Sequence, residues 1–192
     1  MSAPAPIGWP TGRITASRYL RLVDDGLLGP DDKVELLEGV VVSMAPSGPR
    51  HAAAVRRMTL AFVRAVGDRA VVSVQLTFIA GRWSVPEPDL AILPGTLDAY
   101  DAVHPSDALL VVEASDSSLP QDRITKSAIY AAAGIPEYWI VNLRDDVVEV
   151  QRRLDRRARR YRLRTVARRG ETLVPVALPD VRIAVDAIMP RR

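Results

Sequence analysis

The sequence predicts a single α/β domain, and three observations support this prediction. The chain has 192 residues, the length of one ordinary domain, and its 48% hydrophobic and 26% charged residues are typical of globular proteins. Two short and very apolar runs, ALLVVEA at 108–114 and EYWIVNL at 137–143, are typical of strands buried inside a sheet. Segments with the apolar spacing of helices stand between the predicted strands, and no repeat or linker divides the chain.

Residues 1–13 are expected to form a flexible arm before a single domain at 14–190. The first twelve residues contain three prolines and neither lysine nor arginine, so they lack the charged start and apolar middle of a secretory signal. The domain begins with helical spacing over residues 14–25. Thr15 and Ser17 are both available as its N-cap, because a hydroxyl oxygen can accept a bond from a free amide of the first turn.

A turn and a second helix are expected next. Residues 33–43 read as a turn or a helix end that passes through Gly39 into a short strand. Residues 51–66 have apolar residues on one helical face and arginines directed outward. His51 opens this helix and is interpreted as a cap, with a contact to phosphate as the alternative.

The middle of the chain predicts a sheet with one more helix. Strands are expected at 71–79 and at 90–93, where Pro88 and Asp89 lead into a buried segment. The run at 108–114 is too apolar for a surface strand, so it is placed centrally in the sheet. A helix follows over 122–133 and is closed by glycine and proline, after which comes the buried strand at 137–143.

The last quarter of the chain predicts more β-structure. Residues 147–153 and 159–166 have the spacing of the two arms of a hairpin, which would be added to the central sheet. Short late strands are expected at 173–176 and 181–185.

Composition excludes several classes of protein and site. No apolar run approaches the roughly 18 residues of a membrane span, so a membrane partner is not expected. The chain has no cysteine, which excludes disulfides, thiolate metal sites and a cysteine nucleophile. Its two histidines, His51 and His104, are too few and too far apart to indicate a zinc site. The expected compartment is the cytoplasm.

The positive charge is concentrated in the predicted hairpin. The chain carries 26 basic and 23 acidic residues, yet the segment RRLDRRARRYRLRTVARR at 152–169 contains ten arginines and one acid. Such a ribbon indicates either a contact with a polyanion or a solvated face in an arginine-rich chain. The candidate DNA-binding residues are Arg152, Arg153, Arg156, Arg157, Arg159 and Arg160.

Three residues form a candidate catalytic group. Asp89 enters a strand behind a proline, which holds the preceding chain extended. Glu113 follows four apolar strand residues, and a carboxylate there is costly to bury unless it is paired. Lys126 lies in the next predicted helix, on one face with Asp122 and Tyr130, which stand four residues away on either side.

Two carboxylates on adjacent strands and a nearby ammonium are what a phosphodiester hydrolase needs. Carboxylate oxygens suit Mg²⁺ or Mn²⁺, and Mg²⁺ keeps several waters of its own. Such a metal lowers the pKa of a water and screens phosphate charge, while the lysine stabilises negative charge that develops on phosphorus.

The residues that carry this chemistry also resemble a known family. Pro88-Asp89, Glu113 and Lys126 resemble a permuted PD-(D/E)xK nuclease signature. More narrowly, VVEASDSSLPQDRITKSAIYAAAGIPEYWIVN and, upstream, VELLEGVVVSMAPSGPRH with its Ser-Pro and following histidine resemble the Uma-two family of restriction endonucleases. The match runs in unbroken order from Thr15 to Glu149 and implies a restriction-endonuclease-like mixed central sheet flanked by helices.

The resemblance assigns roles to individual positions. Glu35 corresponds to the early helix acid of such sites, with Glu38 as the alternative. Asp89 and Glu113 match the pair that binds Mg²⁺ or Mn²⁺, and Lys126 matches the catalytic lysine, moved from the strand to the following helix.

One position resembles a substrate-orienting residue and one departs from the wider superfamily. Gln75, on the preceding predicted strand, corresponds to a glutamine that orients substrate or water. Ser115 stands two residues after Glu113, where the wider superfamily has its lysine. Catalysis therefore requires that Lys126 reach the site from its helix.

Structural roles are the alternative for each of these residues. Asp89 could satisfy backbone donors at a strand start, Glu113 could pair with an arginine, and Lys126 could pair with Asp122 on the helix surface. In that case the nuclease fold would be retained as a non-catalytic module that binds nucleic acid or protein.

The favoured hypothesis is a Mg²⁺-dependent DNA endonuclease, and a hydrolase of small phosphate esters is a weaker one. DNA is the expected partner. A homodimer is expected as well, because two symmetric sites are the simplest way to cut both strands of a duplex.

Overall fold

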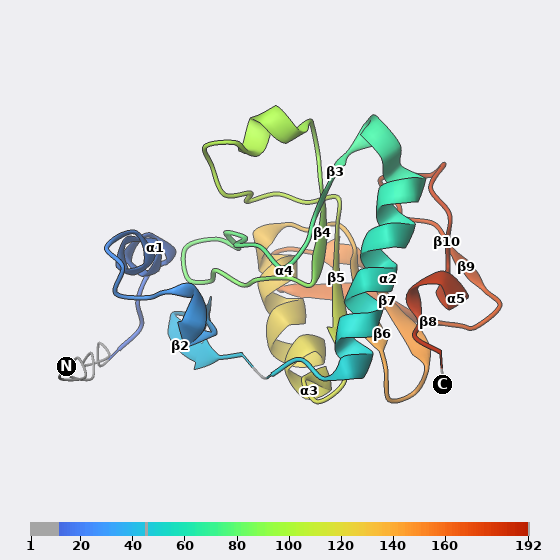
Figure 1. Ribbon diagram of the computed structural model, residues 1–192, viewed down its shortest axis with the longest axis horizontal. Coiled ribbons are helices and arrows are strands. Elements are labelled where there is room, and N and C mark those ends of the chain that lie inside the picture. The colour runs from blue at the N-terminus through green and yellow to red at the C-terminus, as the bar shows by residue number, and fades with distance from the viewer. Residues whose placement is uncertain (1–11, 45, 192) are drawn as a thin grey trace.

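A six-stranded mixed sheet forms the centre of the computed structural model, which describes residues 12–44 and 46–191 (Figure 1). Its strand order is β3-β4-β5-β6-β7-β8, in which β5 and β6 run parallel and the other neighbours are antiparallel. The predicted mixed sheet with flanking helices is therefore confirmed. The strands are β3 Val71–Ser73, β4 Leu90–Leu93, β5 Leu110–Ser115, β6 Tyr138–Asn142, β7 Val147–Asp155 and β8 Arg160–Arg168.

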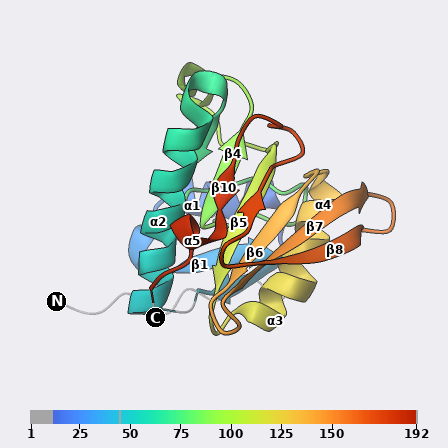
Figure 2. The ribbon, with the colours of Figure 1, turned by 90° about the vertical axis from the view of Figure 1, so that its right-hand side faces the viewer.

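Helices cover both faces of this sheet (Figure 2). One face packs against α2 (Pro49–Val66) and the short α5 (Val185–Ile188). The other packs against a continuous helical segment made of α3 (Leu119–Gln121), a π-helical turn (Asp122–Lys126) and α4 (Ser127–Ala133). The predicted second and third helices are thus present on opposite faces.

Two hydrophobic cores explain why the central strands are apolar throughout. Leu90 and Ile92 of β4 face the α2 core, whereas Ala91 and Leu93 face the α4 core. This alternation follows from the pleat, which directs successive side chains to opposite faces. Trp139 of β6 is fully buried in the α2 core, as the sequence predicts.

The N-terminal segment forms a separate layer built from α1 (Ala16–Asp24), β1 (Val34–Leu37) and β2 (Val40–Ser43). Of the two predicted caps, Thr15 is the one whose side chain accepts a bond from the first turn of α1. The expectation of a turn or helix end at the start of 33–43 is wrong, because residues 34–37 form a strand.

Tertiary contacts explain the strand β1. It pairs with β2 across a tight turn, and Leu36 exchanges two backbone hydrogen bonds with Val85. Leu36 and Val85 are also buried together with Tyr19 of α1. These partners satisfy the backbone of β1 on both edges and hold it extended.

Several predicted boundaries also move. The strand expected at 71–79 ends at Ser73, and the helix expected from residue 122 already begins at Leu119. Leu60 and Val63 of α2, each 51% exposed, lie outside the core. The late strands shrink to a two-residue pair, β9 and β10. The remaining short elements are Pro30–Asp32, Gly67–Arg69, Leu97–Tyr100, β9 Thr172–Leu173 and β10 Ile183–Ala184.

The hairpin β7–β8 is confirmed and continues the central sheet at one edge. Of the predicted arm 1–13, residues 1–11 lie outside the described residues. Arg13 is described, and its Nε donates to the carbonyl of Glu38 at 2.8 Å. In the described part of the chain, no helix has the length and apolar character needed to cross a membrane.

Candidate active site

Asp89 and Glu113 meet where β4 begins. In the antiparallel pair β4–β5, Leu90 lies opposite Val112, so Asp89 comes opposite Glu113. The backbone N–H of Asp89 donates to Oε2 of Glu113 at 3.2 Å, and the N–H of Ala114 donates to Oδ2 of Asp89 at 2.9 Å. The two predicted carboxylates are therefore neighbours, and both are almost completely buried.

Lys126 reaches this pair from the helical segment. Its Nζ lies 3.1 Å from Oε1 of Glu113 and 3.2 Å from Oε2 of Glu35. Tyr130, one turn further on, donates its hydroxyl to the same Oε1 of Glu113 at 2.8 Å. The lysine thus stands between two carboxylates with only 7% of its surface exposed, which is the opposite of a helix-surface position.

The π-helical turn determines where Lys126 and Asp122 point. Both side chains are buried, and Lys126 makes its ion pairs with Glu35 and Glu113. Asp122 accepts hydrogen bonds from the hydroxyls of Ser115 and Ser118. Ser115, which occupies the position of the lysine in the wider superfamily, therefore anchors the helix that carries Lys126. Single π turns are rare and are frequent at functional sites.

Glu35 is in the site, but on a strand. It is carried by β1, so its predicted location on a helix is wrong. Besides its contact with Lys126, its Oε2 accepts a bond from the N–H of Glu87 at 3.4 Å. The alternative residue, Glu38, lies in the β1–β2 turn and pairs with Arg13 and Arg159.

Gln75 also reaches the site, although not from a strand. It follows β3 with a φ of 49°, in the left-handed region that non-glycine residues adopt rarely. Its Nε2 donates to Oδ1 of Asp89 at 3.1 Å. Strained backbone of this kind clusters at functional sites, where the surrounding structure holds it in place.

His51 is a member of the site that the sequence interpretation missed. It is the third residue of α2 rather than its cap, and its Nε2 lies 2.9 Å from Oδ2 of Asp89. Its Nδ1 is buried and has no hydrogen-bond partner among the described residues. The histidine that follows Ser-Pro in the upstream family segment was the available signal.

Histidine and aspartate stabilise each other's charged forms. Burial opposes the ionisation of Asp89, but the hydrogen bond and charge of His51, together with the bonds from Ala114 and Gln75, hold the pKa of Asp89 below its usual value. The hydrogen bond to Asp89 in turn raises the pKa of His51, against the opposing effect of burial. Asp89 is therefore a carboxylate at neutral pH.

Burial dominates the chemistry of Glu113. It raises the pKa of this carboxyl, and the Lys126 ammonium offsets only part of the effect. Burial also opposes the charge on Lys126, but Glu113 and Glu35 outweigh it and raise the lysine's pKa above the usual value. The lysine is a permanent cation at the centre of an acidic site.

The donor set suits a hard divalent ion. No group of three or more histidine and acidic side chains among residues 12–44 and 46–191 forms a ready-made metal cage. Mg²⁺, however, is commonly held by one or two carboxylates, with waters and substrate phosphate completing its shell. Oδ1 of Asp89 and Oε2 of Glu113 each accept a single described hydrogen bond, and each carboxylate oxygen offers about two acceptor positions.

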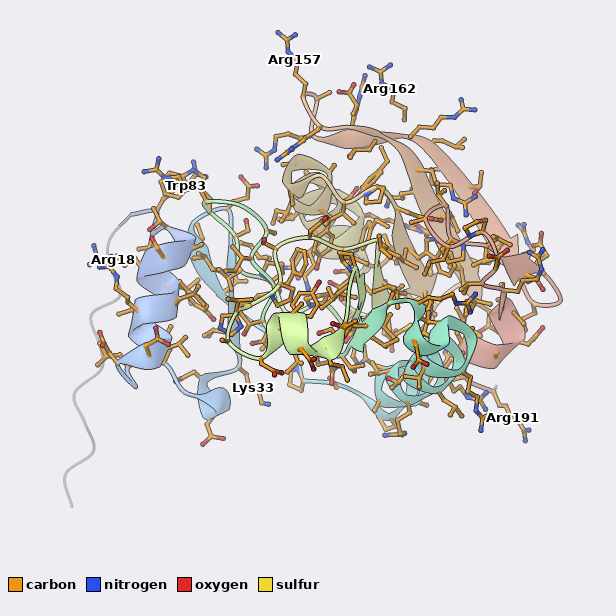
Figure 3. The ribbon with its side chains drawn as sticks, turned by 90° about the horizontal axis from the view of Figure 1, so that it is seen from above. Arg18, Lys33, Trp83, Arg157, Arg162 and Arg191 are labelled. Carbon is orange, nitrogen blue, oxygen red and sulfur yellow. The ribbon has the colours of Figure 1, made fainter. Side chains whose placement is uncertain are left out.

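The six candidate DNA-binding arginines are not equivalent. Arg152 is largely covered and pairs with the fully buried Glu137 at 2.7 Å, so its role is structural. Arg159 pairs with Glu38, and Arg156 donates to the carbonyl of Ala132 at 3.1 Å. The exposed remainder lie in or beside the hairpin turn, where Figure 3 shows Arg157 pointing away from the protein. They are Arg153, Arg157 and Arg160.

Comparisons with known proteins agree with this fold. The model of the Uma2 (Uma-two) family, described as "Putative restriction endonuclease", matches residues 16–186. Among solved structures, that of "a putative nuclease belonging to DUF820" from Anabaena variabilis ATCC 29413 superposes with a TM-score of 0.71 at 14% identity, over 91% of this chain and 97% of that one. No curated protein matches the chain in sequence. Because the family model spans nearly the whole described domain, the chain belongs to the Uma2 family.

Proposed function

We propose that this protein is a metal-dependent nuclease that hydrolyses phosphodiester bonds of DNA at the site formed by Asp89, Glu113 and Lys126. The observation that carries the proposal is the position of Lys126, whose buried ammonium lies 3.1 Å from Glu113 while Glu113 is bonded to the backbone of Asp89. A lysine on the solvent face of its helix would have favoured the non-catalytic module instead. Family membership supports the same reading.

Asp89 and Glu113 are the residues that would hold Mg²⁺ or Mn²⁺. When bound, such an ion supplies Lewis-acid stabilisation of a phosphoryl oxygen and a water of lowered pKa. His51 and Gln75 orient Asp89 by their two side-chain bonds, which leave the carboxylate little freedom to rotate. Outer-shell partners of this kind commonly contribute 10–100-fold to metal affinity or activity.

Lys126 supplies positive charge where negative charge develops. In hydrolysis, a water oxygen forms a bond to phosphorus, the bond from phosphorus to the leaving sugar oxygen breaks, and that oxygen takes a proton. An ammonium held in place before the reaction stabilises the added charge without reorganisation. Glu35 and Glu113 fix the Lys126 ammonium from two sides and keep it protonated.

Plasmid nicking in Mg²⁺ or Mn²⁺ tests the proposal. We expect Lys126→Met to lower the nicking rate by at least 100-fold, in the range observed when one preorganised electrostatic group is removed. Asp89→Asn and Glu113→Gln are expected to abolish nicking. Lys33→Met is the matched control, because Lys33 is the chain's other lysine and is exposed.

The outcomes separate the two functions. Activity that is lost in the three site variants and kept in Lys33→Met supports a nuclease. Nicking that persists in Asp89→Asn and Glu113→Gln contradicts the proposed site. DNA binding without cleavage under any metal condition would favour the non-catalytic module.

A further inference from the structure

A second concave site lies apart from Asp89, Glu113 and Lys126. It has a volume of about 530 Å³ and is lined by the 79–84 loop, the end of α4 and the turns of the hairpins β1–β2 and β7–β8. Figure 3 shows Trp83 of this loop on the same side of the molecule as the Arg157 end of the β7–β8 hairpin. Pockets of 300–1,000 Å³ are the size that binds small ligands.

Positive charge dominates the lining of this pocket. It includes four arginines, Arg13, Arg82, Arg156 and Arg159, against the single carboxylate Glu38. Glu38 pairs with Arg159 and lies 3.8 Å from Arg13. The described polar contact of Arg156 is to the neutral carbonyl of Ala132, so its charge is available to a ligand. The pocket is therefore built to receive an anion.

An aromatic ring adds a second recognition element. The guanidinium carbons of Arg13 and Arg82 lie 4.7 Å and 5.1 Å from the centre of the Trp83 ring. Guanidinium groups bind phosphate through paired hydrogen bonds, and aromatic rings bind the faces of nucleobases. The ligand that presents a phosphate and a flat π-face together is a nucleotide.

We propose that this pocket binds one unpaired nucleotide of a DNA strand, with its phosphate on the guanidinium groups of Arg82 and Arg156 and its base against Trp83. A base in a duplex is stacked on both faces and can reach a pocket only by leaving the stack, at a cost of a few kcal/mol. The proposal rests on the proposed function in that DNA is the ligand, and it narrows the substrate to DNA that contains single-stranded nucleotides.

Fluorescence anisotropy in EDTA tests the pocket without cleavage. The probe is a labelled 15-nucleotide single strand, and a blunt hairpin duplex of equal length is compared with it. For the double variant Arg82→Glu/Arg156→Glu we expect single-strand binding to weaken by at least tenfold. The slope of log K against log salt should fall by about 1.4, since each lost phosphate contact on a single strand contributes about 0.7.

A charge-matched control lies on α2. Arg56→Glu/Arg64→Glu makes the same charge change on two exposed arginines of that helix. We expect this variant to bind the single strand within about threefold of the wild type. Equal weakening in both double variants would show a diffuse electrostatic effect and overturn the pocket.

Trp83→Leu tests the base contact. Loss of a base–aromatic stack costs roughly 1–3 kcal/mol, or about five- to 150-fold in affinity. We expect weaker binding of the single strand and unchanged binding of the duplex, so that the preference for the single strand disappears. Competition with inorganic phosphate and with dAMP distinguishes a strand from a free nucleotide: stronger binding of dAMP than of the 15-mer would overturn the assignment to a strand.

Failure of this inference is distinguishable from failure of the proposed function. If the pocket variants bind like the wild type while site variants lose nicking, the pocket proposal is wrong and the nuclease stands. If binding depends on the pocket and no nicking occurs, the reverse holds. Melting temperatures of all variants check folding, and Arg82→Glu alone serves if Arg156→Glu disturbs the end of α4.

Discussion

At the scale of single residues, the site depends on carboxylates that are buried but never left without a partner. Glu113 receives a lysine, a tyrosine hydroxyl and a backbone amide, and Asp89 receives a histidine, an amide side chain and a backbone amide. A carboxylate buried without such partners would be too costly to retain. The same bonds aim the oxygens, so the groups that offset the cost of burial also preorganise the site.

Replacement of His51 should weaken metal binding more than it weakens folding. We expect His51→Gln to reduce Mn²⁺ affinity by about 10–100-fold, because the bond that orients Asp89 is lost or lengthened. Isothermal titration of Mn²⁺ into the apoprotein measures this. His104→Gln is the matched control, since His104 is the chain's other histidine and lies exposed in a loop. Equal affinity in wild type and His51→Gln would remove His51 from the site.

At the scale of elements, the basic hairpin is bound to the rest of the protein by its own arginines. Glu149 of β7 is 1% exposed and accepts bonds from Arg123 of the π-helical turn, Arg164 of β8 and Asn142 of β6. Arg152 pairs with Glu137, which also accepts the indole N–H of Trp139 and the amide of Val176. Part of the charge that resembles a polyanion surface in the sequence is therefore used to join strands.

Glu149 should make stability depend on pH. Burial opposes its ionisation, but the bonds from Arg123 and Asn142 and the charge of Arg164 hold the pKa of Glu149 below its usual value. The carboxylate therefore stabilises the fold above the unfolded pKa of about 4.3, and the contribution is lost as the pH falls through the lower folded value.

Urea unfolding measures this effect. At pH 7 we expect Glu149→Gln to be less stable than the wild type by about 1.5–3 kcal/mol, the range for hydrogen bonds to charged groups. The difference should shrink as the pH falls below about 4, because the wild type then loses its charge as well. Asp98→Asn, at an exposed acid, should show no such trend. A difference that is constant from pH 7 to pH 3 would contradict the prediction.

The elements also show which sequence patterns were sufficient. The runs that became β5 and β6 predicted themselves, because strands covered on both faces must be apolar on both. The strand β1 did not, because its extended backbone depends on Val85, about 50 residues away. The strand expected at 71–79 ended early because Gln75 adopts a positive φ and turns its side chain to Asp89.

At the scale of the whole molecule, the site joins the N-terminal layer to the central sheet. Glu35 comes from β1, Glu113 from β5 and Lys126 from the helical segment, so the ion pairs of one lysine connect three parts of the chain. A bound ion at Asp89 and Glu113 would therefore stabilise the folded protein as a unit, since the unfolded chain offers no such site.

Mn²⁺ should raise the melting temperature of the wild type. At a free concentration 100 times the dissociation constant, binding to the folded state adds about 2.7 kcal/mol. For a chain of this size that corresponds to roughly 5–11 °C. Differential scanning fluorimetry measures the shift, and Asp89→Asn/Glu113→Gln should show none. An equal shift in this variant would place the ion elsewhere.

The predicted homodimer belongs to the same scale and stays a prediction. Sedimentation of the protein with and without duplex DNA tests it. A monomer that nicks single strands would agree with a site for unpaired nucleotides, whereas a dimer that cuts both strands would favour the two-fold arrangement.

The sequence by itself determined the α/β class, the two central strands, and the placement of Asp89, Glu113 and Lys126 on neighbouring elements. Hydrophobic patterning and strand order carry that information, because they act over a few residues or follow the order of the chain. Only the tertiary structure decided that Glu35 stands on a strand, that His51 contacts Asp89, and which arginines are paired. Each of these depends on packing between segments tens of residues apart, and local propensity has no means of expressing such contacts.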